Sequence, residues 1–136
     1  VNIDVVLEIH MNTLHDSVAT YLRLHELVGR ANLGATLDAG NMYAIAHAEK
    51  GESAILAAKD VLRYVHLKNC IAVAGTFSYT VDLQSGDINH DKLCRVLHRI
   101  GYEGDVCIEY CGEGDPHPRA KADRAYWSSL RQEVFA

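Results

Sequence analysis

Four ionisable residues follow short apolar runs and carry the side chains that bind metals in proteins. They are Glu8, Asp38, His66 and Glu109, which close the sequences Val-Val-Leu-Glu, Ala-Thr-Leu-Asp, Arg-Tyr-Val-His and Val-Cys-Ile-Glu. A parallel strand buried on both faces is normally apolar, so an ionisable residue within it must be paired, metal-bound or functional. Three converging carboxylates would raise one another's pKa unless a cation neutralised them. Three oxygens and one imidazole therefore predict one divalent metal ion, Mn²⁺, with Mg²⁺, Co²⁺ or Zn²⁺ as alternatives.

Two further polar residues extend this set along the same faces of the strands. Side chains two apart in a strand share a face, so His10 lies on the face of Glu8, and Lys68 lies on that of His66. His10 could contact a substrate or support the metal, or it could be a structural histidine. Lys68 could neutralise charge on a substrate, or form a structural ion pair. The four ionisable residues could also be separate salt-bridged residues, so both interpretations stay open.

The chain alternates β-branched runs with segments of helical period, which is typical of successive βα units around a parallel sheet. Asp16 or Ser17 is expected to cap the first helix and Gly29 to end it, and Asn89 and Gly101 bound a later helix. Small and polar residues from 70 to 89 predict a long loop. The predicted strands cover 3–9, 34–38, 64–68 and 105–110. The predicted helices cover 17–29, 42–62, 89–101 and 120–134, and an interruption near 51–53 could divide the second of these into two helices.

Four βα units in 136 residues amount to half of a (β/α)8 barrel, which takes about 250 residues. The ionisable residues would all lie toward the carboxyl ends of their strands, where barrels build their active sites. An open, doubly wound sheet is the alternative fold, but its Gly-x-Gly-x-x-Gly signature is absent after Ile9. The predicted fold class is α/β, with residues 1–136 as one domain of four consecutive βα units. Its open sheet edges should pair with a missing N-terminal half-barrel or with a second copy.

The composition is that of one globular domain, with 49% hydrophobic residues, 23% charged residues and a net charge of −5. Basic residues form no run, which argues against nucleic acid as a partner. No apolar stretch reaches the roughly 20 residues of a membrane helix and no signal sequence opens the chain, so no membrane partner is expected. Four cysteines without Cys-x2-Cys spacing favour the cytoplasm. Surface positions on helices or caps are expected for His25, His47, His90 and His98.

Five short motifs occur in order along almost the whole chain. They are Leu-Glu-Ile-His at 7–10, Leu-Asp-Ala-Gly-Asn at 37–41, Val-His-Leu-Lys-Asn at 65–69, Ser-Gly-Asp-Ile-Asn at 85–89 and Gly-Tyr-Glu-Gly-Asp-Val-Cys-Ile-Glu-Tyr at 101–110. In this order the sequence resembles strands five to eight, the C-terminal half, of the xylose isomerase-like (sugar phosphate isomerase/epimerase) TIM-barrel superfamily. The resemblance implies that Glu8, Asp38, His66 and Glu109 bind the metal. It also implies that Glu8 and Glu109 exchange protons with the carbon beside a substrate carbonyl.

The resemblance implies a metal-dependent isomerase or epimerase that acts on a small sugar or polyol-derived carbonyl compound through an enediolate. Asn41 stands where many members carry a histidine and is expected to hydrogen-bond a sugar hydroxyl. Ser78 and Tyr79 stand where an epimerase often presents an arginine to its substrate. These departures leave room for a dehydratase of the inosose or dehydroshikimate type. Phosphodiester cleavage, which needs several metal ions, and an inactive half-barrel are the remaining alternatives.

Overall fold

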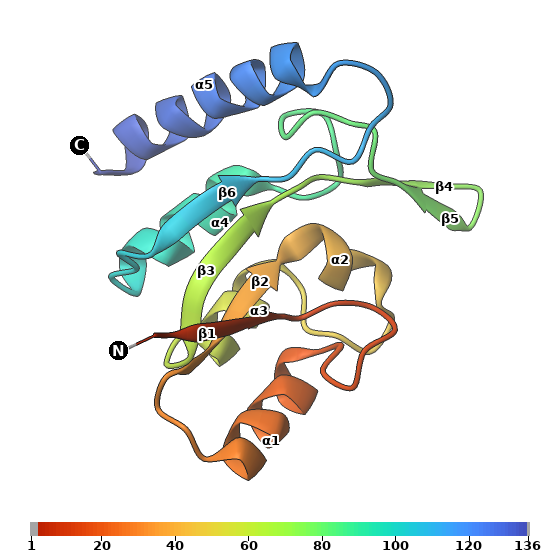
Figure 1. The fold of residues 1–136 in the computed structure, drawn as a ribbon. Helices are drawn as coiled ribbons and strands as arrows, with labels where there is room; N and C mark the ends of the chain where they lie inside the picture. Colours follow the sequence, from red (N-terminus) through yellow and green to blue (C-terminus); the bar gives the residue numbers. More distant parts are fainter. Residues whose placement is uncertain (1–2, 136) are drawn as a thin grey trace.

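The computed structural model describes residues 3–135 and contains a four-stranded parallel sheet with the strand order β1-β2-β3-β6 (Figure 1). An antiparallel hairpin, β4–β5, follows β3. The strands are β1 (Val5–Glu8), β2 (Leu33–Asp38), β3 (Leu62–Leu67), β4 (Ile71–Val73), β5 (Thr76–Ser78) and β6 (Asp105–Ile108). The helices are α1 (Val18–Val28), α2 (Ala39–Ala44), α3 (Gly51–Ala58), α4 (His90–Arg99) and α5 (Pro116–Phe135). Each connection within the parallel sheet carries a helix, as such crossovers require.

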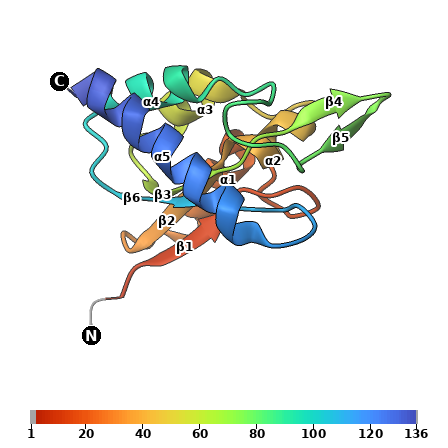
Figure 2. The same ribbon diagram turned by 90° about the horizontal axis from the view of Figure 1, so that it is seen from above.

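The helices follow one another in the same order as the strands. Helix α1 contacts α3, α3 contacts α4, and α4 contacts α5. Figure 2 shows α3 and α4 together on one side of the sheet. A strand order that follows the chain order without reversal is typical of consecutive units in a βα barrel, whereas a doubly wound sheet reverses its order at a switch point. The observed order therefore favours the barrel-type α/β fold over the open alternative.

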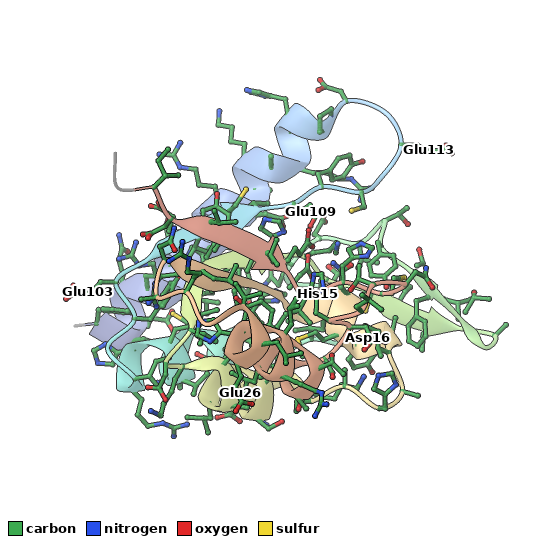
Figure 3. The ribbon with its side chains drawn as sticks, turned by 60° about the horizontal axis from the view of Figure 1, so that its bottom comes forward. His15, Asp16, Glu26, Glu103, Glu109 and Glu113 are labelled. Carbon is green, nitrogen blue, oxygen red and sulfur yellow. The ribbon has the colours of Figure 1, made fainter. Side chains whose placement is uncertain are left out.

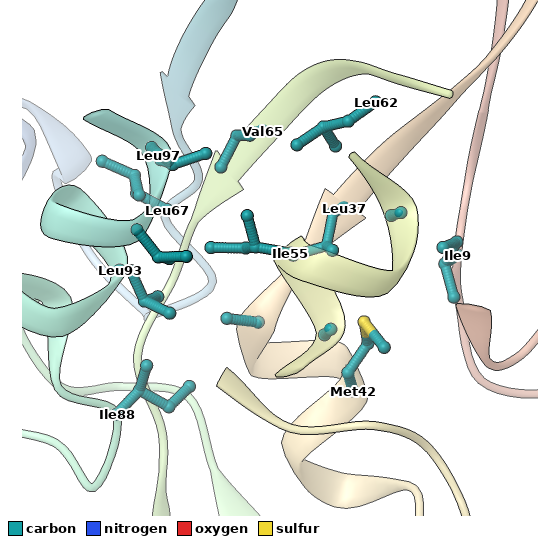
Figure 4. Close-up of a cluster of buried hydrophobic side chains, with 14 of the residues drawn as sticks. Ile9, Leu37, Met42, Ile55, Leu62, Val65, Leu67, Ile88, Leu93 and Leu97 are labelled. Carbon is teal, nitrogen blue, oxygen red and sulfur yellow. The ribbon is translucent and has the colours of Figure 1, made fainter. Parts of the chain in front are cut away.

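Alternate strand residues divide between a hydrophobic core and the opposite face of the sheet. Leu37 of β2 and Val65 of β3 are almost completely buried and belong to the same core cluster as Ile55 of α3 (Figure 4). Successive side chains of a strand point to opposite faces, so Asp38 and His66 point away from this helix-covered core. The hydrophobic pattern of the strands thus decides which face receives the ionisable residues.

Side-chain caps fix the ends of two helices where the sequence predicts them. The hydroxyl of Ser17 accepts a hydrogen bond from the backbone N–H of Thr20, and α1 ends before Gly29, whose φ of 61° is left-handed. Asn89 accepts from the backbone N–H of Lys92 at 3.0 Å and caps α4. These contacts satisfy N–H groups that the first helical turn leaves without partners. The predicted caps of both helices are confirmed.

The helical region predicted at 42–62 forms two helices, which was one of the predicted possibilities, but the break between them lies elsewhere. Residues 45–50 separate α2 from α3, whereas the interruption was expected near 51–53. The ammonium group of Lys50 donates to the carbonyl oxygens of Met42, Tyr43 and Ile45. Carbonyls at the end of a helix lack intrahelical partners, so Lys50 stabilises the break.

Several other boundaries differ from the predicted ones. Strand β1 begins at Val5, two residues later than expected, and β6 ends at Ile108, two residues earlier. The predicted loop at 70–89 contains the β4–β5 hairpin. Helix α5 starts at Pro116 instead of 120, because proline in the first helical turn has no N–H to lose from the helical ladder. Within residues 3–135, no helix is long and apolar enough to cross a membrane.

Candidate metal centre

The four predicted ligands meet at the carboxyl ends of adjacent parallel strands. Glu8 and Asp38 are the last residues of β1 and β2, His66 lies near the end of β3, and Glu109 follows β6 directly. One ligand atom from each lies within 4.8 Å of the others. Strand register produces this convergence, since Asp38 is the direct partner of His66 across β2 and β3. In Figure 3, Glu109 lies near the middle of the molecule, whereas Glu103 and Glu113 lie at its periphery.

The imidazole of His66 faces all three carboxylates. Its Nδ1 atom lies 3.2 Å from Oε2 of Glu109, 3.5 Å from Oε1 of Glu8 and 3.7 Å from Oδ2 of Asp38. Both Nδ1 of His66 and Oδ2 of Asp38 are buried and have no hydrogen-bond partner among the described residues. Buried polar atoms are normally hydrogen-bonded, so two facing atoms without a hydrogen bond can accommodate a further partner. A divalent cation bound by carboxylates and imidazole fits this donor set.

The two carboxylate oxygens of Asp38 make different contacts. Oδ1 accepts a hydrogen bond of 3.0 Å from the backbone N–H of Asn41 and caps α2, which leaves Oδ2 on the side of the other ligands. Complete burial would raise the pKa of Asp38, but contacts with His66 and Glu109 and the charge of Lys68 lower it to about 2. Asp38 is therefore a carboxylate at neutral pH.

The ammonium group of Lys68 lies between two of the predicted ligands. Its Nζ atom is 3.0 Å from Oδ2 of Asp38 and 3.1 Å from Oε2 of Glu109, although the side chain of Lys68 is only 5% exposed. Burial alone would lower the pKa of Lys68, but the two carboxylates outweigh it and raise the pKa to about 12. The structure thus pairs Lys68 with the ligand carboxylates, which is the ion-pair alternative that the sequence left open.

The other two predicted substrate contacts differ in their distance from the ligands. Asn41 is buried, and its Nδ2 atom donates to Oε1 of Glu8 at 2.7 Å. The ring of His10 instead hydrogen-bonds with the carbonyl of Met11 at 2.8 Å. Within residues 3–135, no hydrogen bond or ion pair joins His10 to the four predicted ligands. The structure therefore brings Asn41 and Lys68 to the site and leaves His10 in its own loop.

A buried polar network behind the site was not predicted. Asn69 and His90 are each 1% exposed, so the expected surface position of His90 was wrong. Burial lowers the pKa of His90 to about 4. The signal was present in the sequence, because His90 is in helical phase with Leu93 and Leu97, which face the core. The first turn of α4 also contains the polar residues Asp91 and Lys92, which obscure the helical phase of His90 in the sequence.

The three carboxylates and the imidazole lie at the carboxyl ends of consecutive parallel strands, which is where βα barrels build their active sites. The family described as xylose isomerase-like TIM barrel matches residues 1–130. The chain therefore belongs to this family, and the resemblance inferred from the five sequence motifs is confirmed. The chain is thus related to enzymes of the sugar isomerase and epimerase type.

Individual relatives match almost the whole chain but are longer than it. A ketose 3-epimerase of Arthrobacter globiformis is 30% identical over 132 residues, which are 96% of this chain and 41% of the relative. The structure of an L-ribulose 3-epimerase matches with a TM-score of 0.80 at 22% identity, over 96% of this chain and 48% of that one. A probable 3-DHS dehydratase, AsbF of Bacillus anthracis, matches with a TM-score of 0.77 at 22% identity, over 92% and 49%. The chain spans about half the length of these relatives.

Proposed function

We propose that residues 1–136 form strands five to eight of a xylose isomerase-like barrel and that Glu8, Asp38, His66 and Glu109 bind one divalent metal ion, Mn²⁺. One observation carries the proposal. Four donors from four adjacent strands converge within 4.8 Å, and two of their atoms are buried without a hydrogen-bond partner. Mg²⁺, Co²⁺ and Zn²⁺ remain alternatives, because all of them bind carboxylates and imidazole.

The proposed reaction is isomerisation or epimerisation of a small sugar or polyol-derived carbonyl compound through an enediolate. The metal would act as a Lewis acid that polarises a carbonyl and the neighbouring hydroxyl. Glu8 and Glu109 approach the site from β1 and β6, the two outer strands of the sheet. Asn41 holds Oε1 of Glu8, so Oε2 of Glu8 is the atom to accept a proton from carbon. Oε2 of Glu109 contacts His66 and Lys68, so its Oε1 is the atom to return one.

A complete active site needs further protein elements to enclose it, which this chain does not supply. Val5 and Val6 on the edge strand β1 are 49% and 40% exposed, and the relatives are about twice as long. We propose that either an N-terminal half-barrel or a second copy covers the open sheet, and that the chain is inactive without such a partner. The four cysteines are free thiols, which suits the proposed cytoplasmic location.

Calorimetric titration of the purified chain with Mn²⁺ tests the metal site. We expect one ion per chain, and we expect Glu8→Gln and Glu109→Gln each to weaken binding strongly. Glu113→Gln is the matched control, because Glu113 is an exposed glutamate on the loop after β6. Absence of Mn²⁺ binding, or more than one ion per chain, would contradict the proposal. Several ions per chain would favour phosphodiester cleavage instead.

A metal-dependent dehydratase is a second candidate function, favoured by the similarity to the probable 3-DHS dehydratase. Both reactions begin with removal of a proton beside a carbonyl, so the same two glutamates serve either. A panel of ketoses, inososes and 3-dehydroshikimate separates them when products are followed by NMR. Epimerised ketose supports the leading proposal. Loss of water without an epimer supports the dehydratase.

A further inference from the structure

The side chain of Lys68 is enclosed in a way that fixes the position of its ammonium group. Lys68 is 5% exposed, and its Nζ atom lies 5.4 Å from the centre of the Tyr79 ring. A Cβ added to Gly40 would lie 3.1 Å from both Cγ and Cε of Lys68, so the absent side chain of Gly40 leaves room for the lysine stem. The Tyr79 ring and the carboxylates of Asp38 and Glu109 surround the ammonium group, so its charge has a fixed position.

The ammonium group of Lys68 contacts two of the candidate ligand carboxylates. Nζ of Lys68 donates a hydrogen bond of 3.1 Å to Oε2 of Glu109. It also lies 3.0 Å from Oδ2 of Asp38 and forms an ion pair with that carboxylate. Lys68 therefore compensates negative charge on both Asp38 and Glu109.

The net charge of the cluster determines which metal ion would make the centre neutral. Three carboxylates bring three negative charges, and Lys68 returns one positive charge. With His66 neutral, as a metal ligand must be, the protein contributes two negative charges. One divalent ion would make the loaded centre neutral, whereas a second divalent ion or a trivalent ion would leave it positive. A positive charge in a partly buried site is unfavourable.

We propose that Lys68 is the internal counter-ion of the metal centre, a positioning residue that holds Asp38 and Glu109 together before the metal binds and restricts the centre to a single divalent ion. This inference rests on the proposed metal site and adds to it a basis for selectivity. Because the ammonium group of Lys68 is already paired with Asp38 and Glu109, Lys68 acts on a substrate only through its effect on the charge of the metal centre. The ligand carboxylates would repel one another in the metal-free protein without it.

The test compares Mn²⁺ with Tb³⁺ in charge variants of Lys68. Lys68→Met removes the charge and keeps the stem, Lys68→Gln removes the charge and retains a donor for Glu109, and Lys68→Arg retains the charge. Lys121→Met is the control, because Lys121 is an exposed lysine on α5. Affinities are measured by calorimetry for Mn²⁺ and by luminescence for Tb³⁺, and stability by thermal unfolding with chelator present.

Both neutral variants should unfold at a lower temperature without metal and yet bind Mn²⁺ at least about tenfold more tightly than the unsubstituted chain. The ratio of Tb³⁺ affinity to Mn²⁺ affinity should rise at least about tenfold, because the extra charge of Tb³⁺ is now compensated. Lys68→Arg and Lys121→Met should leave that ratio unchanged. A general loss of packing would weaken the binding of Mn²⁺ and Tb³⁺ together and would not raise the ratio of Tb³⁺ affinity to Mn²⁺ affinity.

Failure of this inference is distinct from failure of the metal site. If the unsubstituted chain binds no Mn²⁺, the proposed function fails. If it binds one Mn²⁺ but the affinity ratio is the same in Lys68→Met and Lys68→Gln, the counter-ion role is wrong. Should the neutral variants unfold without metal, refolding with Tb³⁺ would support the role. Failure to refold with either ion, while Lys68→Arg folds, would contradict it.

Discussion

The side chain of Asn41 binds Glu8 while its backbone binds Asp38. Nδ2 of Asn41 donates to Oε1 of Glu8 at 2.7 Å, and the N–H of Asn41 donates to Oδ1 of Asp38 at 3.0 Å. One residue in the first turn of α2 therefore links candidate ligands on β1 and β2. These hydrogen bonds orient both carboxylates, so that Oδ2 of Asp38 and Oε1 of Glu8 face the imidazole of His66.

Asn41→Ala should weaken Mn²⁺ binding by about ten- to a hundredfold, because loss of a residue that orients a metal ligand typically has this effect. Calorimetric titration measures the change. Asn32→Ala is the matched control, since Asn32 donates only to the carbonyl of Ile3 in an exposed loop. Equal affinity in Asn41→Ala and the unsubstituted chain would show that Glu8 needs no support. The predicted contact of Asn41 with a substrate hydroxyl stays a prediction for its Oδ1 atom.

Asp38→Asn should separate the capping role of Asp38 from its role as a ligand. Asparagine retains an oxygen for the N–H of Asn41, so α2 stays capped, but the negative charge for the metal is gone. We expect Mn²⁺ binding to be lost in Asp38→Asn and in Asp38→Ala. Only the alanine variant should lose the cap as well, at about 1 kcal/mol of unfolding free energy. Retention of Mn²⁺ affinity in Asp38→Asn would remove Asp38 from the ligand set.

Mn²⁺ should stabilise the folded chain to the extent that it binds. At a free concentration about 100 times the dissociation constant, the free energy of unfolding rises by about 2.7 kcal/mol when only the folded state binds. Urea denaturation with Mn²⁺, and again after a chelator is added, measures this increment. Asp38→Asn should show no increment. A similar increment in both proteins would assign Mn²⁺ to some other site.

The buried His90 should make the fold less stable in weak acid. Desolvation lowers its pKa from 6.5 to about 4, so between these values the unfolded chain binds a proton that the folded chain does not. Stability contributed by neutral His90 is therefore complete above about pH 6.5 and is lost as the pH falls toward 4. The full loss is up to about 3 kcal/mol.

His90→Asn isolates this contribution. Asparagine can still donate to the carbonyl of Leu83, which lies 3.2 Å from Nδ1 of His90, but it does not titrate. Urea denaturation at several pH values should show a smaller fall in stability for His90→Asn between pH 6.5 and 4. The exposed His117→Asn is the control and should follow the unsubstituted chain. Identical pH dependence in all three proteins would mean that His90 is protonated freely in the folded state.

The order of the units and the four candidate ligands could be predicted because they depend on local patterns. Alternation along β2 and β3 places Leu37 and Val65 on one face and their neighbours Asp38 and His66 on the other. The chain order of the units then makes these strands adjacent. Nothing more than period and order is needed to bring such residues together.

Contacts that depend on side-chain direction were not predictable in this way. The amide of Asn41 could reach a substrate or Glu8, and the ammonium of Lys68 could point outward or between two carboxylates, with no difference in the sequence pattern. The β4–β5 hairpin was missed because its strands have three residues each, too few for a clear alternation. The burial of His90 was not predicted, because the polar residues around it in the first turn of α4 mask its helical phase with Leu93 and Leu97.

Asn69 ties the loop after β3 to the start of α4. Its Oδ1 atom accepts from the N–H groups of Cys70 and Ile88, both at 2.9 Å, and its Nδ2 atom donates to the carbonyls of Leu83 and Ile88. The amide is 1% exposed and follows Lys68 directly, so the network also fixes the backbone beside the candidate metal centre. Asn69→Ala should lower the free energy of unfolding by about 2 to 4 kcal/mol, because buried backbone groups lose their partners.

Gly86 packs so closely on Asn69 that the two positions should not act independently. A Cβ at Gly86 would overlap the side-chain amide of Asn69, so Gly86→Ala alone should also be strongly destabilising. In the Asn69→Ala background this overlap disappears, and the double variant should be more stable than the sum of the two single losses by about 1 kcal/mol or more. Urea denaturation of the four proteins gives this coupling energy. Gly75→Ala is the control, because Gly75 lies in the β4–β5 hairpin with open space around it, and its loss of stability should add to that of Asn69→Ala. If the losses of Gly86→Ala and Asn69→Ala were additive as well, the close packing of Gly86 on Asn69 would not exist in solution.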